Sequence, residues 1–287
     1  MSASQPHRIF DRRAYRRRRR RAFETGPDLL LLNETAEQVA ARIASINRRF
    51  AHALDLNSRP QSFAHLRSAA DTWTRAGIDA AAADVIADDE YLPFADETFD
   101  LVTSIMSLHS VNDLPGALIQ IGRVLKPDGV FLATLFGGET LRELRFAFAA
   151  AEAATAGGAS PRVAPFADVR DLGGLLQRAG FALPVADIDR TVVRYRDPMR
   201  LLFDLRALGE TNVLVQRRPN FVSRRLLHAV LAEYAQSFGD GQGRVPATFD
   251  IVYLIGWAPH DSQQKPLPPG SAKARLADAL REKQPKS

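Results

Sequence analysis

The stretch from Ala53 to Gln61 constrains this chain more than any other segment, because it begins like a strand of a nucleotide-binding sheet and then lacks the usual glycines. Residues 53–56 are apolar apart from Asp55. In nucleotide-binding α/β folds such a strand runs into a glycine-rich turn, whose bare backbone lets the ligand approach closely. Here the turn consists of Asn57, Ser58, Arg59, Pro60 and Gln61. Side chains at all five positions, and a proline without an amide hydrogen, predict a crowded ligand site.

Length and composition narrow the class of protein. With 287 residues, of which 46% are hydrophobic, the chain can bury an α/β core and an added subdomain. No apolar run approaches the roughly 20 residues of a membrane span, and the N-terminus lacks the apolar centre of a secretory signal, so we expect a cytoplasmic protein. The absence of cysteine excludes disulfides and zinc–cysteine sites. The histidines show no HxxxH or HExxH spacing, so no metal site is predicted.

The net charge of +5 is concentrated in an N-terminal arm, where Arg12, Arg13 and the run from Arg16 to Arg21 exceed the whole surplus. Two interpretations are open: a basic helix that docks on its own domain, or one that binds an acidic protein partner. We expect partner capture rather than a role in folding, because unpaired arginines repel one another. An anionic membrane surface would also attract such an arm. Nucleic acid is disfavoured, since no recognisable nucleic-acid fold follows.

Strand and helix patterns alternate after the arm. Near-helical spacing covers residues 28–48, and a capped amphipathic helix is expected over 113–125. Apolar runs predict strands over residues 50–56, 80–87, 101–105 and 130–135. This alternation predicts a Rossmann-like α/β fold, with helices on both faces of a mostly parallel sheet. Ligands then bind outside the carboxyl ends of the strands.

The second half of the chain adds helices and late strands. The patterns predict helices over 139–155, 168–179, 198–208 and 222–238, a strand pair over 181–188 and 191–195, and a strand over 249–257. We divide the chain into a basic arm and helix (1–48), an α/β domain (49–258) with a helical insertion at about 197–240, and a Pro- and Lys-rich tail (259–287).

The segment after the first strand is unusually short. Only the residues from Asn57 to Ala87 separate that strand from the loop at Asp88. Two helices and two strands with their connections usually take roughly 40 residues or more. We therefore expect a truncated helix or a lost strand, which would weaken the wall that holds the ribose of a nucleotide.

Several motifs, found together and in this order, resemble the complex I assembly factor 5 group. They are Ile9-Phe10-Asp11-Arg12, Leu92-Pro93-Phe94, Ser107-Leu108-His109, Val111-Asn112-Asp113-Leu114-Pro115, Leu125-Lys126-Pro127-Asp128-Gly129, Gly137-Gly138-Glu139-Thr140-Leu141 and Gly256-Trp257. This group is similar to the biotin-pathway malonyl-carrier-protein methyltransferases. Its best-known member is regarded as a hydroxylase of an arginine on a complex I subunit. The resemblance implies a class I methyltransferase fold, S-adenosylmethionine as cofactor, a basic N-terminal helix and added C-terminal helices.

The resemblance also implies cofactor contacts for individual residues. Asp55 matches the acid near the end of the first strand, and Asn57 and Ser58 fall in the cofactor turn. Asp88, followed by Asp89, matches the carboxylate that accepts from the adenine amino group, and its alternative role is that of a loop-capping acid. 

The remaining implied positions line the other side of the site. Met106, Ser107 and Leu108 match the segment that faces the cofactor and the substrate. His109 is either a general base or a hydrogen-bonded wall of the pocket. Asp71 is expected to match the ribose-binding acid after the second strand.

Three function classes follow from these observations. The first is an S-adenosylmethionine-dependent methyltransferase, the second an arginine hydroxylase of a complex I subunit, and the third a noncatalytic assembly scaffold with a degenerate cofactor site. We expect a role in complex I assembly, weak or absent cofactor binding, and a complex I subunit or assembly intermediate as the partner. The expected location is cytoplasmic, at the periphery of the inner membrane, or the mitochondrial matrix in a eukaryote.

Overall fold

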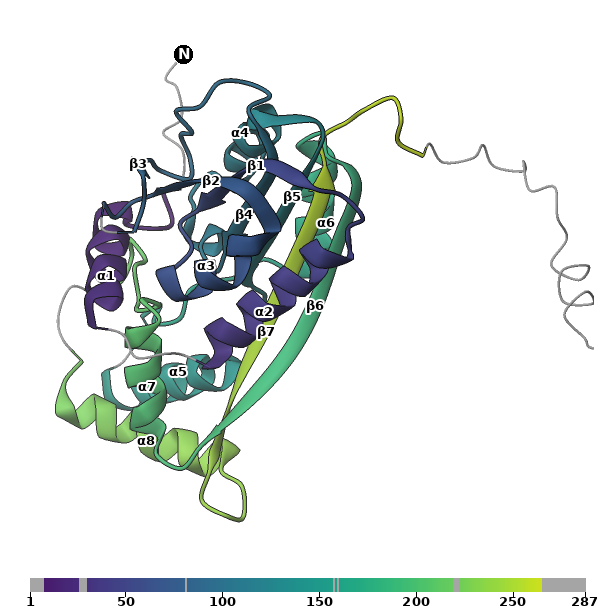
Figure 1. The fold of residues 1–287 in the computed structure, drawn as a ribbon. Helices are drawn as coiled ribbons and strands as arrows, with labels where there is room; N and C mark the ends of the chain where they lie inside the picture. Colours follow the sequence, from purple (N-terminus) through teal and green to yellow (C-terminus); the bar gives the residue numbers. More distant parts are fainter. Residues whose placement is uncertain are drawn as a thin grey trace, which may run out of the picture.

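Seven strands form one sheet in the order β3-β2-β1-β4-β5-β7-β6 (Figure 1). The computed structural model describes residues 8–25, 30–80, 82–156, 158, 160–218 and 222–264. The five strands from β3 to β5 run parallel, and β7 pairs antiparallel with both β5 and β6. The predicted Rossmann-like sheet is confirmed, with an antiparallel pair added at one edge.

The strands follow the apolar runs, with alternate side chains facing opposite sides of the sheet. Phe131 and Leu132, for example, belong to different core clusters. The strands are β1 (Phe50–Leu56), β2 (Ala70–Gly77), β3 (Val85–Ile86), β4 (Phe99–Ile105), β5 (Leu125–Phe136), β6 (Ala182–Tyr195) and β7 (Val245–Trp257).

Helices cover both faces of this sheet. The apolar sides of α4 and α6 pack on one face, and those of α2, α3, α5, α7 and α8 join the core cluster of the other. Figure 1 shows α5, α7 and α8 gathered at one end of the molecule, beside the long pair of β6 and β7. The helices are α1 (Arg12–Thr25), α2 (Leu30–Ser45), α3 (Pro60–Leu66), α4 (Leu114–Val124), α5 (Arg142–Ala156), α6 (Val169–Arg178), α7 (Pro198–Ala207) and α8 (Arg224–Phe238), with short 3₁₀ turns at Arg67–Ala69 and Leu108–Ser110.

The predicted shortening between the first strand and Asp88 is visible in the structure. α3 has only 7 residues, β3 has only 2, and the described residues between β2 and β3 form no helix. The predicted strand over 80–87 is therefore mostly wrong, and β2 was missed because its side chains are largely polar and half-exposed. Residues 57–87 are therefore short because they contain little helix, while both strands, β2 and β3, are present.

The C-terminal half differs from its prediction in one strand. The late strands predicted over 181–188 and 191–195 are one continuous strand, β6, which pairs with β7 along most of its length. The helices α7 and α8 lie within the expected insertion. Most of the predicted tail, residues 265–287, lies outside the described residues.

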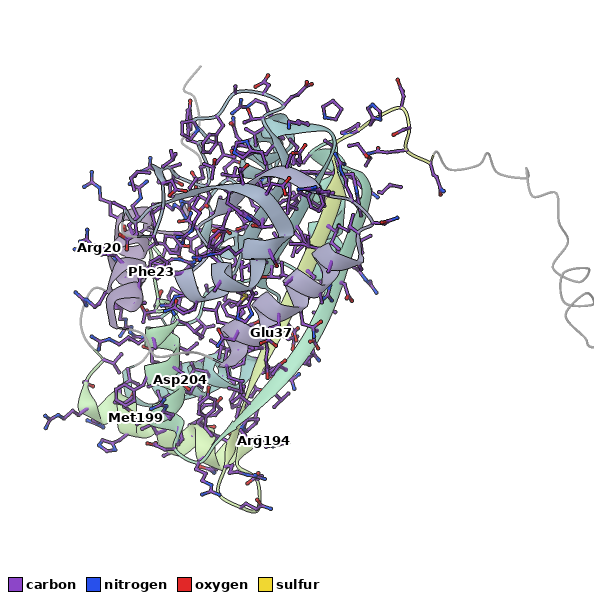
Figure 2. All side chains as sticks on the ribbon, viewed as in Figure 1. Arg20, Phe23, Glu37, Arg194, Met199 and Asp204 are labelled. Atoms are coloured by element: carbon purple, nitrogen blue, oxygen red, sulfur yellow. The ribbon has the colours of Figure 1, made fainter. Side chains whose placement is uncertain are left out.

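The arginine arm forms helix α1, which packs on its own domain. Ala14, Tyr15 and Ala22 are buried, and so is the side chain of Arg19. The outward face carries Arg13, Arg17 and Arg20, which are exposed, and Figure 2 shows Arg20 pointing away from the body. Of the two interpretations, the basic helix that docks on its own domain is confirmed, because the inward arginines bind carboxylates and carbonyls of this chain. The expectation that the arm serves partner capture rather than folding is wrong in its second part.

Candidate functional site

The candidate site lies where the parallel strands end. Because β1 to β5 run in one direction, the residues that follow them meet at one edge of the sheet. Asn57 follows β1, Asp88 follows β3 and Met106 follows β4. Helix α1 crosses this carboxyl edge, since its arginines contact all three of those positions.

Asn57 shapes the turn after β1. It has φ of 57°, a left-handed conformation that asparagine tolerates better than most residues. Its side-chain oxygen accepts from the amide of Ile78 at 2.9 Å, and its Nδ2 donates to Asp89 Oδ1 at 2.5 Å. The side chain therefore ties the turn to β2 and to the loop after β3, in the space that a glycine would leave open.

Asp55 and Ser58 connect the turn after β1 to the neighbouring strand β4. Asp55 is buried in β1 and accepts from Thr103 Oγ1 at 3.1 Å. Burial raises the pKa of its carboxyl to about 6, although hydrogen bonds from Ser58 and Thr103 oppose the shift. Ser58 is buried, and its hydroxyl accepts from the amide of Ile105 at 3.2 Å. Both residues therefore make internal contacts that brace the turn.

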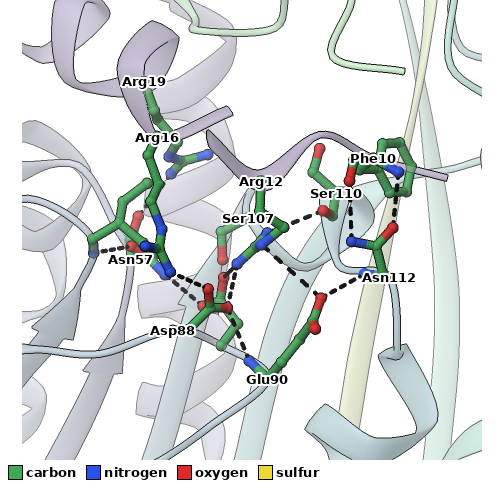
Figure 3. A network of polar contacts seen from close by, with 12 residues as sticks. Phe10, Arg12, Arg16, Arg19, Asn57, Asp88, Glu90, Ser107, Ser110 and Asn112 are labelled. Atoms are coloured by element: carbon green, nitrogen blue, oxygen red, sulfur yellow. Dashed lines mark hydrogen bonds and ion pairs between the residues drawn. The ribbon is translucent and has the colours of Figure 1, made fainter. Parts of the chain in front are cut away.

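Asp88 is bound by two arginines of α1. Arg12 Nη2 lies 2.5 Å from one carboxylate oxygen and Arg16 Nη2 lies 2.5 Å from the other (Figure 3). Arg12 also reaches Asp89 at 3.2 Å. Burial alone would raise the pKa of Asp88, but Arg12 and Arg16 hold it below its usual value. The carboxylate expected to accept from an adenine amino group is thus already engaged by guanidinium groups.

The chain before α1 is fixed to the same loop. Asn112 Oδ1 accepts from the amides of Ile9 and Phe10 at 2.9 and 2.8 Å, and Glu90 accepts from the amide of Asn112 at 2.8 Å (Figure 3). Phe10 forms a bridge with Leu214 in the loop after α7. These contacts explain why the Ile-Phe-Asp-Arg and Asn-Asp motifs occur together, because they hold the start of α1 in place.

Arg19 is the deepest contact of α1. Its side chain is 2% exposed, and its guanidinium donates to the carbonyl oxygens of Met106 and Asn57, each at 2.7 Å. Met106, like Asn57, has a positive φ, of 54°. Non-glycine residues held in this conformation concentrate at functional sites, where the surrounding structure maintains them.

His109 and Glu210 form a pair beside Arg19. His109 Nε2 lies 3.0 Å from Glu210 Oε2, and Glu210 Oε1 lies 3.8 Å from Arg19 Nη1. Burial would raise the pKa of Glu210, but His109 and Arg19 lower it. The Nδ1 atom of His109 is buried and has no hydrogen-bond partner among the described residues. Glu210 was missed at the level of sequence, because nothing in its local pattern links it to His109.

The other expected positions divide between two places. Ser107 and Leu108 are buried at the carboxyl edge, and the Ser107 hydroxyl contacts that of Ser104 at 2.7 Å. The expectation that Asp71 follows the second strand is wrong, because Asp71 lies near the start of β2, where it pairs with Arg49 on the surface. The carboxylate that lies just beyond the end of β2 is instead Asp79, which is buried.

Comparison with known proteins decides the family. A family model described as "Methyltransferase domain" matches residues 36–133, from within α2 to within β5. The zebrafish protein (Danio rerio) named arginine-hydroxylase NDUFAF5, mitochondrial, is 41% identical over 293 residues, which cover 96% of this chain and 91% of the relative. The chain belongs to the NDUFAF5 family. The resemblance inferred from the motifs is therefore confirmed.

More distant comparisons place the NDUFAF5-family chain among methyltransferase folds. A malonyl-[acyl-carrier protein] O-methyltransferase of Halorhodospira halophila is 38% identical over 181 residues, which cover 63% of this chain and 59% of that protein. The solved structure of the YcgJ protein from Bacillus subtilis covers 77% of this chain and 98% of its own, with a TM-score of 0.53 at 12% identity. The second likeness shows the fold alone.

The carboxyl edge of this NDUFAF5-family chain does not fit S-adenosylmethionine as it stands. A Cβ atom on Gly77 would come within 2.8 Å of Asn57 Oδ1, so the asparagine fills the turn up to β2. Both oxygens of Asp88 are engaged by α1, and Arg19 occupies the space beside Asn57 and Met106. A cofactor would have to compete with three arginines of the chain itself.

Neither a metal centre nor a membrane-spanning helix occurs among the described residues. No group of three or more histidine and carboxylate side chains in that part of the chain is arranged to hold a metal ion. Nor does any helix there combine the length and apolar character that crossing a bilayer requires. The functional groups of the carboxyl edge are thus acids, carbonyls, His109 and the arginines of α1.

Proposed function

We propose that this chain acts in the assembly of respiratory complex I, by binding an arginine-bearing subunit or assembly intermediate at the carboxyl edge of its sheet. One observation carries the proposal: the groups at this edge hold guanidinium. Asp88 binds Arg12 and Arg16, and the carbonyls of Asn57 and Met106 bind Arg19. The names of the relatives, arginine-hydroxylase, agree with a site of this chemistry.

The acceptors suit arginine better than lysine. A guanidinium presents several N–H donors in a fixed plane, and two of them reach, at the same distance, two carbonyl oxygens that follow different strands. Glu210 supplies the opposite charge close by, and its lowered pKa keeps it ionised. Within the proposal, His109 and Glu210 are the acid–base pair beside the bound side chain.

S-adenosylmethionine is proposed to bind weakly or not at all, since Asn57 and the three arginines fill the places it needs. Calorimetric titration of the purified chain tests this. A dissociation constant of about 1 μM or tighter, equivalent to roughly 8 kcal/mol, is too favourable for a site filled in this way and would contradict the proposal.

Methyl transfer is the second candidate function. It is favoured by the methyltransferase family model and by the acids Asp79 and Asp88, which lie just beyond β2 and β3. Tight binding in the same titration, together with a methylated partner, would establish it in place of the first.

The assembly role is tested in cells. A deletion strain is complemented with the wild-type chain, with His109→Ala, and with Leu56→Asp, which buries an unpaired carboxylate in β1 and serves as the unfolded control. We expect defective assembly of the NADH dehydrogenase in the deletion strain and rescue by the wild type. Normal assembly without the protein contradicts the proposed function. If His109→Ala is folded and fails, the scaffold alternative is excluded.

Mass analysis of the partner separates the three function classes. An arginine that loses a hydroxyl group in the deletion strain supports the hydroxylase, and one that loses a methyl group supports the methyltransferase. Unchanged arginines with defective assembly support a noncatalytic scaffold. The proposed place of action is the cytoplasm or, in a eukaryote, the mitochondrial matrix; the relatives' names, which say mitochondrial, support the second of these.

A further inference from the structure

Arg19 sits in its surroundings as a bound ligand would. Its guanidinium is buried and donates to two main-chain carbonyls, which follow β-strands far apart in the sequence. Two aromatic rings near it, Tyr15 and Phe23 at 5.6 and 5.5 Å, belong to α1 itself and would move with the helix. The rest of the chain supplies two carbonyl acceptors and a nearby carboxylate, which are the elements of a guanidinium-binding pocket.

The fixed part of this pocket does not come from α1. The carbonyls of Asn57 and Met106 follow β1 and β4, and Glu210 follows α7. Asn57 and Met106 are both held at positive φ by hydrogen bonds to neighbouring strands. The pocket is therefore built into the sheet, while its occupant is delivered by a separate helix.

The fit of Arg19 is incomplete. Its Nε atom is buried and has no hydrogen-bond partner among the described residues. Arg59 lies close enough for the two like charges to repel: burial and the charge of Arg19 together lower the pKa of Arg59 to about 10, although Glu210 opposes the shift. An unpaired donor and a like charge both reduce the cost of removing Arg19.

The attachment of α1 consists mainly of polar contacts made by its arginines. Outside Arg19, the helix is held by Arg12 and Arg16 on Asp88, and by Arg18 on the carbonyl of Asn212. Few large apolar side chains of α1 are buried; Tyr15 is the main one. The Arg12 pair with Asp88 is largely buried, whereas the side chain of Arg16 is 50% exposed, so its ion pair is the one that salt weakens most.

We propose that Arg19 is an internal stand-in for the partner's arginine, and that α1 leaves the carboxyl edge when an arginine side chain of the partner takes the same pocket. This inference rests on the proposed function, because it specifies how the site that function requires is kept filled until a partner arrives. The class of ligand is a peptide arginine, recognised by the two carbonyls and Glu210.

Opening the pocket by substitution tests the inference directly. N-acetyl-L-arginine methylamide is titrated into Arg19→Ala, with the wild type and the outward-facing variant Arg20→Ala as controls. We expect Arg19→Ala to bind the probe at least about tenfold more tightly than either control. The corresponding lysine and citrulline compounds should bind more weakly, and Glu210→Gln in the Arg19→Ala background should reduce binding of the arginine compound. A folded Arg19→Ala that binds no better than the wild type overturns the inference.

A second measurement needs no destabilising variant. Hydrogen exchange of the amides in α1 is followed in the wild-type chain as the arginine or lysine probe is added. Displacement of Arg19 predicts faster exchange in residues 12–25 with the arginine probe, and no change with lysine at equal concentration and ionic strength. Equal effects of the two probes would show a salt effect on α1 and would overturn the inference. These assays use the isolated protein, so their outcome is separate from the assembly defect that tests the proposed function.

Discussion

His109 and Glu210 meet at 3.0 Å although they lie 101 residues apart in the chain. His109 sits in the 3₁₀ turn after β4, and Glu210 lies in the loop that follows α7. The histidine that the motif singled out therefore depends on a carboxylate contributed by the C-terminal helices. This contact joins the methyltransferase-like sheet to the segment that was expected to be an insertion.

A double-mutant cycle measures this coupling. We expect His109→Ala and Glu210→Ala to interact by about 1–3 kcal/mol in unfolding free energy, because either substitution alone leaves a buried partner unpaired. The comparison pair is His109→Ala with Arg49→Ala, whose side chain is exposed, and there additivity within about 0.5 kcal/mol is expected. Additive behaviour of the first pair in urea denaturation would show that the contact carries no energy.

Asp88→Asn should destabilise the fold through α1. The substitution removes the charge that holds both Arg12 and Arg16, and charge-assisted hydrogen bonds of this kind contribute about 1.5–3 kcal/mol. The matched control is Asp96→Asn, since Asp96 also pairs with an arginine but is 73% exposed. Its effect should stay within about 0.5 kcal/mol. Equal effects of the two substitutions would mean that α1 gains nothing from Asp88.

Removing residues 1–25 should lower the melting temperature clearly. The truncation exposes the surface that covers Tyr15 and Ala14 and leaves Asp88 and Glu210 without their arginines. Arg17→Gln and Arg20→Gln, on the outward face of α1, serve as controls and should leave the melting temperature nearly unchanged. A truncated chain as stable as the wild type would restore the view of the arm as a free partner-capture segment.

Because the pKa of Asp55 is raised in the folded state, we expect the free energy of unfolding to fall as the pH rises. Its folded pKa of about 6 lies above the ordinary value of 3.8, so the folded state binds the proton more tightly and its contribution is lost as pH rises through about 6. At about 1.4 kcal/mol per pKa unit, the difference amounts to roughly 3 kcal/mol. Asp55→Asn should remove this pH dependence.

Asp88→Asn is the comparison variant for the pH dependence of Asp55→Asn, because the pKa of Asp88 is lowered instead of raised. Its contribution is present above 3.8 and is lost as pH falls, so Asp88→Asn should flatten the acid side of the stability curve instead. The measurement is urea denaturation at pH values between about 3 and 8. If Asp55→Asn leaves the slope around pH 6 unchanged, Asp55 is not the titrating group.

Elements were predicted best from the sequence where a local pattern, such as an apolar run or a helix cap, coincides with burial in the structure. β1 was predicted with its observed bounds, and α4 was predicted to within a residue because Asp113 caps it, accepting from the amide of Gly116 at 2.8 Å. The crowded turn after β1 was also readable, since Asn57 fills it. By contrast β2 shows no apolar alternation and is specified by its neighbours β1 and β3.

The position of α1 could not be read from the sequence. A run of arginines is equally satisfied by acids of a partner or of its own chain, and only the fold brings Asp88 and Asp89, about 76 residues away, next to Arg12. Glu210 was hidden for the same reason. The sequence thus predicted that Asn57, Asp88 and Met106 meet at one edge of the sheet, but not that arginines of α1 occupy it; the predicted cofactor contacts stay predictions.

The place of β7 between β5 and β6 also sets the order in which the chain can complete its sheet. β6 leaves the ribosome well before β7, yet its only described neighbour in the sheet is β7. Until Val245–Trp257 has been synthesised, the edge of β5 is open and β6 has nowhere to pair. A nascent chain arrested before β7 would thus present two unpaired strands at once, and a chaperone that covers open strand edges would find its target in that interval.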